Sequence, residues 1–287
     1  MITKPKIWLG VSIGSMLVYI LIIVLMPPLI GIDFKGGALF EIKTTLAPAV
    51  VSDSITKQLQ SSATVQTTEN QSLLVRTTNV SPDQHEALLT DLKKQDATLE
   101  ELRFETVGPT IGEELRRKAW LAMSLSVLVT IAYLAYEFRH TGGLVSSWKF
   151  GVAAAIALVH DLLLVTAAFA ILGRLFSAPI DALFVTAMLA LSGYSVNDTI
   201  VLFNRLKQEW LATRSGNLIT LMDKAVKLTL TRSLNTSIPI LLTLITLLLF
   251  GGTTIRWFIV ALCIGTITGT YSTIYVAPAW LWLMARK

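Results

Sequence analysis

Charged residues and cysteines are scarce in this chain of 287 residues. Only 15% of the residues are charged, whereas 53% are hydrophobic, and the mean hydropathy is +0.63. This balance is typical of a membrane protein. The single cysteine, Cys263, has no partner within the chain, which excludes an internal disulfide and leaves the redox compartment undetermined.

The short motifs of common catalytic and cofactor sites are also absent from the sequence. We find no metal-ligand spacing, no phosphate-binding loop, no nucleophile elbow and no soluble repeat. An intramembrane hydrolase would need a nucleophile paired with a base, and no residues stand out for those roles. We therefore expect neither an enzyme nor a bound cofactor or metal.

Six long apolar stretches are present instead. At a rise of about 1.5 Å per residue, a helix of about 20 apolar residues crosses the hydrocarbon core of a bilayer. The first stretch is longer than the core of a signal peptide and is followed by no small-x-small cleavage site, so we expect an uncleaved helix. The six stretches are Ile7–Met26, Ala119–Tyr136, Phe150–Leu172, Ala182–Phe203, Leu234–Phe250 and Trp257–Met284.

Lysine and arginine in the short loops indicate the orientation of these helices. With the N-terminus inside, twelve basic residues fall in cytoplasmic segments, and only Arg174 and Arg256 fall in outer loops. Arg116, Arg117 and Lys118 would lie outside, but they end a long segment of a kind that crosses largely regardless of charge. We expect both termini in the cytoplasm, so that topology and anionic membrane lipid explain the net charge of +5 without nucleic acid. The twelve are Lys4, Lys6, Arg139, Lys149, Arg205, Lys207, Arg214, Lys224, Lys227, Arg232, Arg286 and Lys287.

Between the first two stretches, residues 27–118 have soluble character and suffice for a small extracytoplasmic domain. Alternating residues predict strands at Gly37–Ile42, in "ATVQTT", in "SLLVRT" after "ENQ", and near Thr98–Val107. Helical spacing in "PAVVSDSITKQLQ" and an N-terminal cap at Ser81 before Pro82 predict two helices. The order βαββαβ predicts an α+β, ferredoxin-like domain.

Two glycine-containing segments join this domain to its neighbours. "GIDFKGG" holds Gly31, Asp33, Gly36 and Gly37, and suits a chain that turns sharply between helix and strand. Asp33 is either a binding residue or a solvated loop carboxylate. "VGPTIGEELRRKAW" holds Gly108, Pro109 and Gly112, and is either a hinge or a plain connector.

We therefore divide the chain into a first helix at 1–26, the outer domain at 27–118, and five helices at 119–287 with a cytoplasmic loop at 204–232. In that loop, a break at Ser215 and Gly216 precedes a basic amphipathic helix, which we expect on the inner membrane surface. The first and last helices carry GxxxG pairs, which permit close helix contact but also arise by chance. These pairs are Gly10 with Gly14 and Gly265 with Gly269.

Polar side chains inside the apolar stretches indicate function, because an ionisable group at the centre of a spanning helix costs about 2.5–3.5 kcal/mol on insertion scales. In the fourth stretch Ser192, Ser195, Asp198 and Leu202 share one helical stripe, with Thr199 at its margin. The third stretch adds His160 and Asp161 near the middle of the membrane. His160 is either part of a proton path or a hydrogen-bonded core residue.

The segment that opens the fifth stretch is also polar on one face. Arg232, Asn235, Thr236 and Pro239 recur at helical spacing, and their depth matches that of Asp198 in the antiparallel fourth helix. We therefore expect the two polar faces to meet. Asp198 and Arg232 then form either a proton-loading site or a purely structural pair, and Arg232 is alternatively a snorkelling anchor.

Six segments of the sequence carry a family likeness. In order, they are "GIDFKGG", "VGPTIGEEL", "ALVHDLLLVT", "LSGYSVNDTIVLFNRLK", "TRSLNTS" and "LLLFGG". Together they closely resemble the SecF family, the smaller subunit of the bacterial SecD/SecF protein-export accessory, within the resistance-nodulation-division superfamily. The likeness covers Gly31 to Lys287, and the segment around Asp198 is its most specific part. Two residues depart from the family: Asn204 stands where Asp is usual, and Lys35 where Thr is common.

The resemblance implies a proton-driven helper in the bacterial inner membrane. Its partners would be SecD, the SecYEG channel, unfolded preprotein and membrane lipid. By motif match, Asp198 would carry protons, Arg232 would be its cationic partner, and Asn235 and Thr236 would line the path. The alternatives are one half of a small-solute or lipid exporter, and a scaffold of the translocon that uses no energy.

Overall fold

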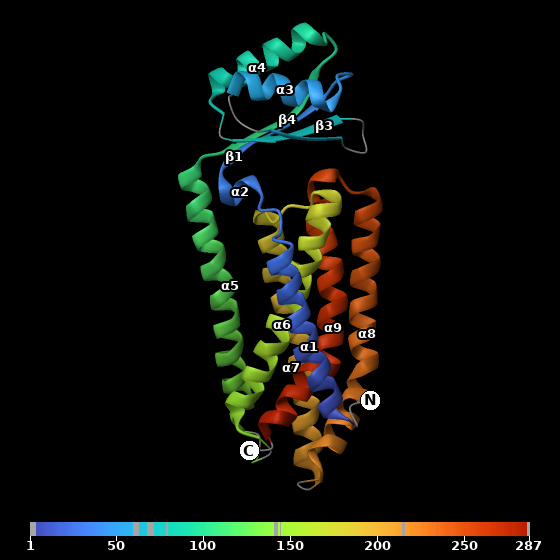
Figure 1. Cartoon of the computed structure of the whole chain (residues 1–287). Helices are drawn as coiled ribbons and strands as arrows, with labels where there is room; N and C mark the ends of the chain where they lie inside the picture. Colours follow the sequence, from blue (N-terminus) through green and yellow to red (C-terminus); the bar gives the residue numbers. More distant parts are fainter. Residues whose placement is uncertain are drawn as a thin grey trace. The chain divides into compact units, whose positions relative to one another are not determined.

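Two compact units make up the chain (Figure 1). The helical unit combines Met1–Leu29 with Trp120–Lys287, and the sheet unit is Ile30–Ala119. The computed structural model describes residues 4–59, 63–67, 72–78, 80–140, 143, 145–213 and 216–285.

The six predicted spanning helices are confirmed, because six helices among the described residues are long and apolar enough to cross a membrane. Several exceed the predicted stretches, since polar turns extend the helices past their apolar centres. The long helices are α1 (Pro5–Leu25), α5 (Pro109–Glu137), α6 (Ser147–Phe176), α7 (Ala182–Thr213), α8 (Leu218–Phe250) and α9 (Arg256–Ala285), with short 3-10 turns η1 (Phe138–His140) and η2 (Thr253–Ile255).

Helix α9 is the central element of the helical unit and packs against α1, α6, α7 and α8. Its glycines allow this approach: a Cβ on Gly265 would lie 2.5 Å from Cδ2 of Leu191, and one on Gly269 would lie 3.2 Å from Cβ of Ser195. The GxxxG pair of the last helix therefore sits in a close contact with α7. By contrast, a Cβ on Gly10 or Gly14 would meet no described heavy atom within 4 Å.

The region predicted as a surface loop differs in the structure. Helix α7 continues to Thr213, and α8 begins at Leu218, where Oδ1 of Asn217 accepts a hydrogen bond from the backbone N–H of Ile219 at 3.0 Å. The amphipathic segment is thus the first part of α8, and its apolar face packs on α7 through a buried cluster that includes Leu206, Met222 and Val226. Of the predicted break, Ser215 lies outside the described residues and Gly216 has a φ of 125°.

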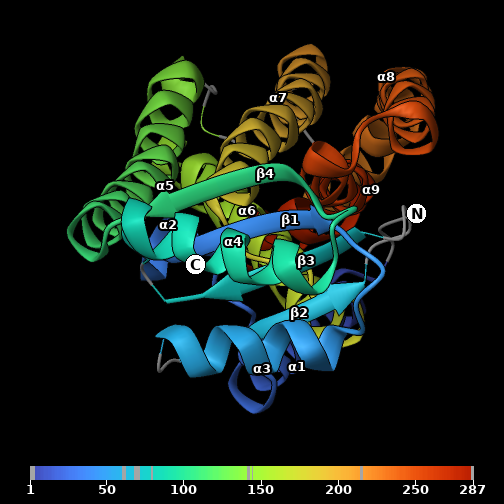
Figure 2. The ribbon, with the colours of Figure 1, turned by 90° about the horizontal axis from the view of Figure 1, so that it is seen from above.

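The sheet unit has the predicted order βαββαβ. Its four antiparallel strands lie in the order β2-β3-β1-β4, so β3 separates β1 from β2, as the split βαβ plan requires. The helices α3 and α4 cover one face of the sheet (Figure 2). The elements are α2 (Ile32–Lys35), β1 (Gly37–Lys43), α3 (Pro48–Leu59), β2 (Thr64–Thr67), β3 (Ser72–Thr77), α4 (Pro82–Gln95) and β4 (Glu100–Val107). The predicted "ENQ" connection lies outside the described residues.

Side chains along the strands alternate between the two faces of the sheet, and those that face the helices form the core of this unit. Phe40 and Ile42 of β1 are buried against apolar side chains of the helices, among them Ile55 of α3 and Leu88 of α4. The predicted cap is confirmed, because Oγ of Ser81 accepts a hydrogen bond from the backbone N–H of Gln84 at 3.2 Å, and Oε1 of Gln84 accepts one from the backbone N–H of Ser81 at 3.0 Å.

Candidate functional site

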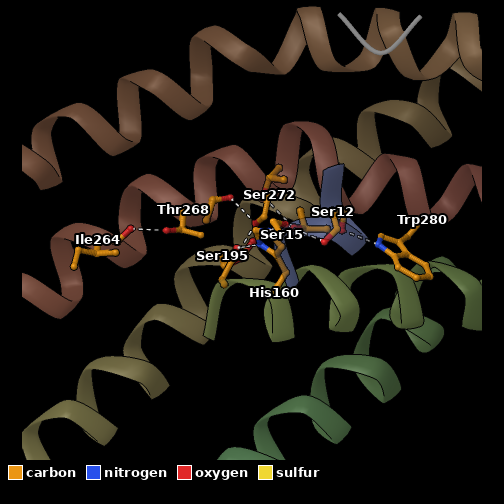
Figure 3. Close-up of polar contacts among 12 residues, drawn as sticks. Ser12, Ser15, His160, Ser195, Ile264, Thr268, Ser272 and Trp280 are labelled. Atoms are coloured by element: carbon orange, nitrogen blue, oxygen red, sulfur yellow. Dashed lines mark hydrogen bonds and ion pairs between the residues drawn. The ribbon is translucent and has the colours of Figure 1, made fainter. Parts of the chain in front are cut away.

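A polar network lies at the centre of the helical unit, where α1, α6, α7 and α9 meet (Figure 3). Asp161 of α6 is fully buried, and its Oδ2 accepts hydrogen bonds from Oγ of Ser195 on α7 and Oγ of Ser272 on α9, each at 2.7 Å. Its Oδ1 lies 3.3 Å from Nδ1 of His160, which is also fully buried. The structure thus brings together three of the predicted residues: His160, Asp161 and Ser195.

The imidazole of His160 connects this network to the first helix. Its Nε2 lies 3.2 Å from Oγ of Ser15, and its ring meets the edge of Tyr19 with ring centroids 5.5 Å apart. One turn before Ser15, Oγ of Ser12 accepts a hydrogen bond from Nε1 of Trp280 at 3.0 Å. Polar contacts therefore hold α1 against α6 and α9.

Asp198 occupies a second site, three residues beyond Ser195 on α7. Its side chain is 6% exposed, and its Oδ2 has no hydrogen-bond partner among the described residues. On α8, the side chain of Ser233 interacts with this carboxyl group, and the guanidinium of Arg232 attracts it electrostatically. The two buried carboxyl groups therefore have different neighbours: Asp161 faces hydroxyl groups of α7 and α9, and Asp198 faces α8.

An open groove of about 760 Å³ lies between α7 and α8 next to this second site. Arg232 lines the groove and also acts on Asp198, so it connects the buried carboxyl group with a space open to small molecules. The other lining residues are Val201, Asn204, Arg205, Gln208, Leu228 and Thr229.

Helix α8 meets α7 and α9 through a different stripe from the predicted one. Arg232, Asn235, Thr236 and Pro239 are exposed on α8, whereas Ser233 and Ser237 are each only 3% exposed. A rotation of one residue, about 100°, separates the two stripes. Of the four predicted residues, the structure thus brings Arg232 within electrostatic reach of Asp198 and leaves the other three on the surface.

Hydrogen bonds between hydroxyl groups connect α7, α8 and α9 around Asp198. Oγ of Ser237 lies 2.6 Å from the Tyr194 hydroxyl on α7 and 2.6 Å from Oγ1 of Thr270 on α9. Oγ1 of Thr199 lies 3.0 Å from Oγ1 of Thr273. These contacts satisfy polar groups that would otherwise be costly inside a membrane.

Several of these partners were not singled out from the sequence. Ser15, Ser233, Ser237 and Ser272 all touch a candidate residue or its neighbour. One signal was available for Ser272, since "GTITGTYSTIY" in the last helix has a hydroxyl-bearing residue at almost every second position. Ser15 and Ser233 were not separated from their polar neighbours, because the sequence alone does not show which of several nearby hydroxyl groups faces a carboxyl group on another helix.

The predicted junction residues come together within the sheet unit. Gly36 has a φ of 75°, and a Cβ there would lie 2.9 Å from Cα of Pro109, the first residue of α5. A Cβ on Gly112 would lie 2.9 Å from the backbone N of Gly36. The two connecting segments thus pack backbone against backbone, which only glycine permits at these positions.

The remaining junction residues flank this contact. Gly31 precedes α2, and Asp33 lies in the first turn of that helix. Gly37 has a φ of 140°, and a Cβ there would lie 2.6 Å from the carbonyl O of Thr77. Gly108 directly precedes α5, and a Cβ there would meet no described heavy atom within 4 Å.

Two buried carboxyl groups in an apolar bundle suit proton binding better than metal binding. The described part of the chain contains no group of three or more histidine, cysteine, aspartate or glutamate side chains that would hold a metal ion. Burial disfavours an ionised carboxylate, so a carboxyl group in such a position takes up a proton readily. Each of these carboxyl groups contacts side chains of neighbouring helices, so its charge bears on how those helices pack.

The chain is similar in sequence to known membrane proteins of protein export. The model of a family described as "Protein export membrane protein SecD/SecF, C-terminal" matches residues 87–287. The chain is 37% identical over 262 residues to the protein translocase subunit SecF of Thermobaculum terrenum, covering 86% of this chain and 82% of that one. It is 35% identical over 280 residues to the SecF subunit of Anaerolinea thermophila, covering 96% and 90%.

Two solved structures are similar over nearly the whole chain. One is the crystal structure of SecDF, a translocon-associated membrane protein, from Thermus thermophilus, with a TM-score of 0.85, 26% identity and coverage of 99% of this chain. The other is SecDF in its super-membrane-facing form, with a TM-score of 0.68, 28% identity and coverage of 97%. The chain spans 38% and 39% of the length of those two chains.

Proposed function

Because this chain belongs to the SecD/SecF family of protein-export membrane proteins, we propose that it acts as the SecF subunit that, together with SecD, uses the proton motive force to assist preprotein export through SecYEG. It would act late in translocation and draw emerging preprotein outward. SecD would supply the part of the SecDF chains that this chain does not span.

The observation that carries this proposal is the environment of Asp198. The carboxyl group is buried, one of its oxygens has no partner among the described residues, and the Arg232 guanidinium attracts it from the edge of a groove. A purely structural pair would be expected to use both oxygens, because an unmade hydrogen bond inside a protein is unfavourable. The free oxygen is available to take up a proton.

Proton binding would be coupled to movement as follows. A protonated Asp198 loses its attraction to Arg232, so α7 and α8 repack, and α9, which contacts both, transmits the change. A proton that crosses a potential of 100 mV releases about 2.3 kcal/mol. That energy shifts a two-state equilibrium about fifty-fold, which moves a balanced switch from roughly 1:7 to 7:1.

The orientation of the protein follows from its charges. Both termini would be cytoplasmic, as the lysines and arginines of the short loops favour. The domain at 27–118 would then lie on the outer side of the bacterial inner membrane and handle preprotein together with SecD.

Replacing Asp198 with Asn tests the proposal. The amide keeps the shape of the side chain but binds no proton, so Asp198→Asn should lose the whole proton-dependent part of export. Export is measured in inverted membrane vesicles that contain SecD and SecYEG, with the proton gradient varied.

The matched control is Asp223→Asn. Asp223 is also buried, but it pairs with Lys227 at 2.6 Å near the start of α8, so its neutralisation should leave the response to the gradient intact. Full proton-dependent export by Asp198→Asn would reject the proposal and favour a scaffold. Proton-coupled movement of a small solute or lipid, without an effect on preprotein, would favour an exporter.

A further inference from the structure

Ser15, His160 and Asp161 form a chain of contacts whose hydrogen atoms can be placed. Oγ of Ser15 donates a hydrogen bond to the backbone carbonyl O of Ser12 at 2.9 Å. The same Oγ lies 3.2 Å from Nε2 of His160, and Nδ1 of His160 lies 3.3 Å from Oδ1 of Asp161.

The serine determines which nitrogen of the imidazole carries hydrogen. A serine hydroxyl has one hydrogen to donate, and that of Ser15 goes to the carbonyl of Ser12, since a carbonyl only accepts. Towards His160 the Ser15 oxygen must therefore accept. Nε2 of His160 carries a hydrogen as a result.

The contact between Nδ1 and Oδ1 then needs one more proton. A neutral imidazole with hydrogen on Nε2 has a bare lone pair on Nδ1. An ionised carboxylate facing that lone pair would have no hydrogen between the two atoms, and the contact would be repulsive. A proton on Nδ1 gives an imidazolium–carboxylate pair, and a proton on Oδ1 gives a neutral pair, and both hold the same number of protons.

We propose that His160 and Asp161 together form a second proton-binding site, which holds one proton in this structure, and that Ser15 of α1 senses whether the site is occupied. This inference deepens the proposed function, on which the role of the site in transport depends. The ligand is a single proton, whose source and destination is solvent; because both side chains are fully buried in this structure, exchange requires the helices around them to part.

Loss of that proton would rearrange the hydrogen bonds of Ser15. The imidazole left behind keeps its contact with the Asp161 carboxylate by carrying its hydrogen on Nδ1, so Nε2 becomes an acceptor. Ser15 must then turn its hydroxyl hydrogen away from the carbonyl of Ser12 and towards Nε2. The occupied state therefore has one more hydrogen bond through Ser15 than the empty state.

The surroundings contain few other groups that titrate. Tyr19 of α1 and Tyr271 of α9 face the ring of His160, with ring centroids at 5.5 Å and 6.1 Å. Ser195 and Ser272 face Asp161 from α7 and α9. Both tyrosines ionise only near pH 10 when unperturbed, so neither competes with the dyad for the proton.

A change in the hydrogen bonds of Ser15 would affect how α1 packs, because few side chains of this helix are buried or make specific contacts with the bundle. Among its described residues only Pro5 and Ser12 are buried. Its specific contacts to the bundle are Ser12 with Trp280, Ser15 and Tyr19 with His160, and the stacking of Trp8 on Tyr275 at 3.9 Å. Two of these four contacts are made to His160, so a switch at the dyad acts directly on α1.

Nitrogen-15 NMR of the full chain, labelled at histidine and held in lipid nanodiscs, tests the proposal directly. The chain has three histidines, so His85→Gln and His140→Gln assign the signal of His160. Infrared spectra with and without Asp161→Asn report whether the carboxyl group is protonated. We expect near pH 7 either an imidazolium, or a neutral ring with hydrogen on Nε2 beside a protonated Asp161.

Two results near pH 7 would overturn the proposed proton site. One is a His160 ring with hydrogen on Nδ1 alone, and the other is a neutral His160 ring with hydrogen on Nε2 beside an ionised Asp161. These readouts need no export, so they stand apart from the Asp198→Asn test. Failure of that export test with an occupied dyad would reject the transport role and leave the proton site.

Ser15→Ala then tests the sensor. The substitution removes two hydrogen bonds through Ser15 from the occupied state and one from the empty state. It therefore destabilises the occupied state more, and the proton should leave at a pH about 0.4–1 unit lower than in the natural chain. Ser12→Ala is the matched control, since Ser12 is buried on the same helix but bonds to Trp280 through its side chain, and it should leave the transition in place. An unchanged transition in Ser15→Ala would overturn the sensing role.

Discussion

Three buried aspartates show how neighbours determine what a carboxyl group does. Asp96, in the sheet unit, accepts hydrogen bonds on both oxygens, from the hydroxyls of Thr44, Thr45 and Thr98 and from the backbone N–H groups of Thr45 and Thr98. Asp161 has hydroxyl groups and an imidazole, and Asp198 has one oxygen without a partner among the described residues. Donors on both oxygens hold Asp96 as a carboxylate, whereas the imidazole beside Asp161 and the unpaired oxygen of Asp198 each leave room for a proton.

Asp96 gives a prediction for the stability of the sheet unit. Hydrogen bonds from the Thr44 hydroxyl, and next from the Thr98 hydroxyl, hold the pKa of Asp96 well below its ordinary value. Because the folded-state pKa is depressed, the stabilisation is complete above the unfolded pKa of about 3.9 and is lost as the pH falls below it. Hydrogen exchange of β1 and β4 in the full chain, corrected for intrinsic rates, should therefore show weaker protection at pH 3 than at pH 6.

Two variants separate Asp96 from other carboxyl groups. Asp96→Asn should weaken protection at pH 6 and flatten its dependence on pH. Thr44→Val removes the strongest donor and should reduce the dependence in part. Equal pH dependence in all three proteins would show that Asp96 is not the group responsible.

At the scale of elements, close backbone contacts decide which helices pair. A Cβ on Gly151 of α6 would lie 2.5 Å from the backbone O of Ile131 on α5, so the two helices touch directly. Beside this contact, the ring of Phe150 stacks on Phe138 with centroids 4.7 Å apart. This corner attaches the C-terminal end of α5 to the bundle.

Gly151→Ala should therefore push α5 away from α6. A backbone oxygen cannot rotate aside as a side chain can, so we expect a loss of about 1–3 kcal/mol in stability. Thermal unfolding followed by tryptophan fluorescence measures it, because all seven tryptophans lie in the helical unit.

Gly193→Ala on α7 is the matched control. It also adds a methyl group inside a spanning helix, but no described heavy atom lies within 4 Å of the new Cβ. Its stability should equal or slightly exceed that of the natural chain, since alanine favours helix over glycine. A similar loss in both variants would mean that the α5–α6 contact is not the cause.

At the scale of the whole molecule, the distribution of charge predicts how the chain lies in the membrane. With Cys263 replaced by Ser, the chain offers a cysteine-free background. A cysteine at the exposed position of Lys57 in α3 should react with a membrane-impermeant maleimide applied to spheroplasts. One at the exposed position of Lys4 should react only after permeabilisation. The reverse pattern would contradict the proposed orientation.

The sequence by itself determined the six spanning helices and the βαββαβ order of the sheet unit. The apolar residues of helices and strands recur with local periods of 3.6 and 2 residues, which can be recognised in the sequence. The length of an apolar run indicates whether it can cross a bilayer. The capping of α4 by Ser81 is similarly local. Asp198 and Asp161 also stood out in the sequence, because a carboxyl group inside an apolar run is conspicuous on its own.

Only the tertiary structure decided which side chains meet those carboxyl groups. The partners of Asp161 come from α6, α7 and α9, and His160 connects this group to α1. These helices are far apart in the sequence. Helix α8 turns Ser233 and Ser237 inward, where its local pattern had favoured Arg232, Asn235 and Thr236. One residue of rotation changes the direction of a side chain by about 100°, and packing against the other helices, which no single helix encodes, sets that rotation.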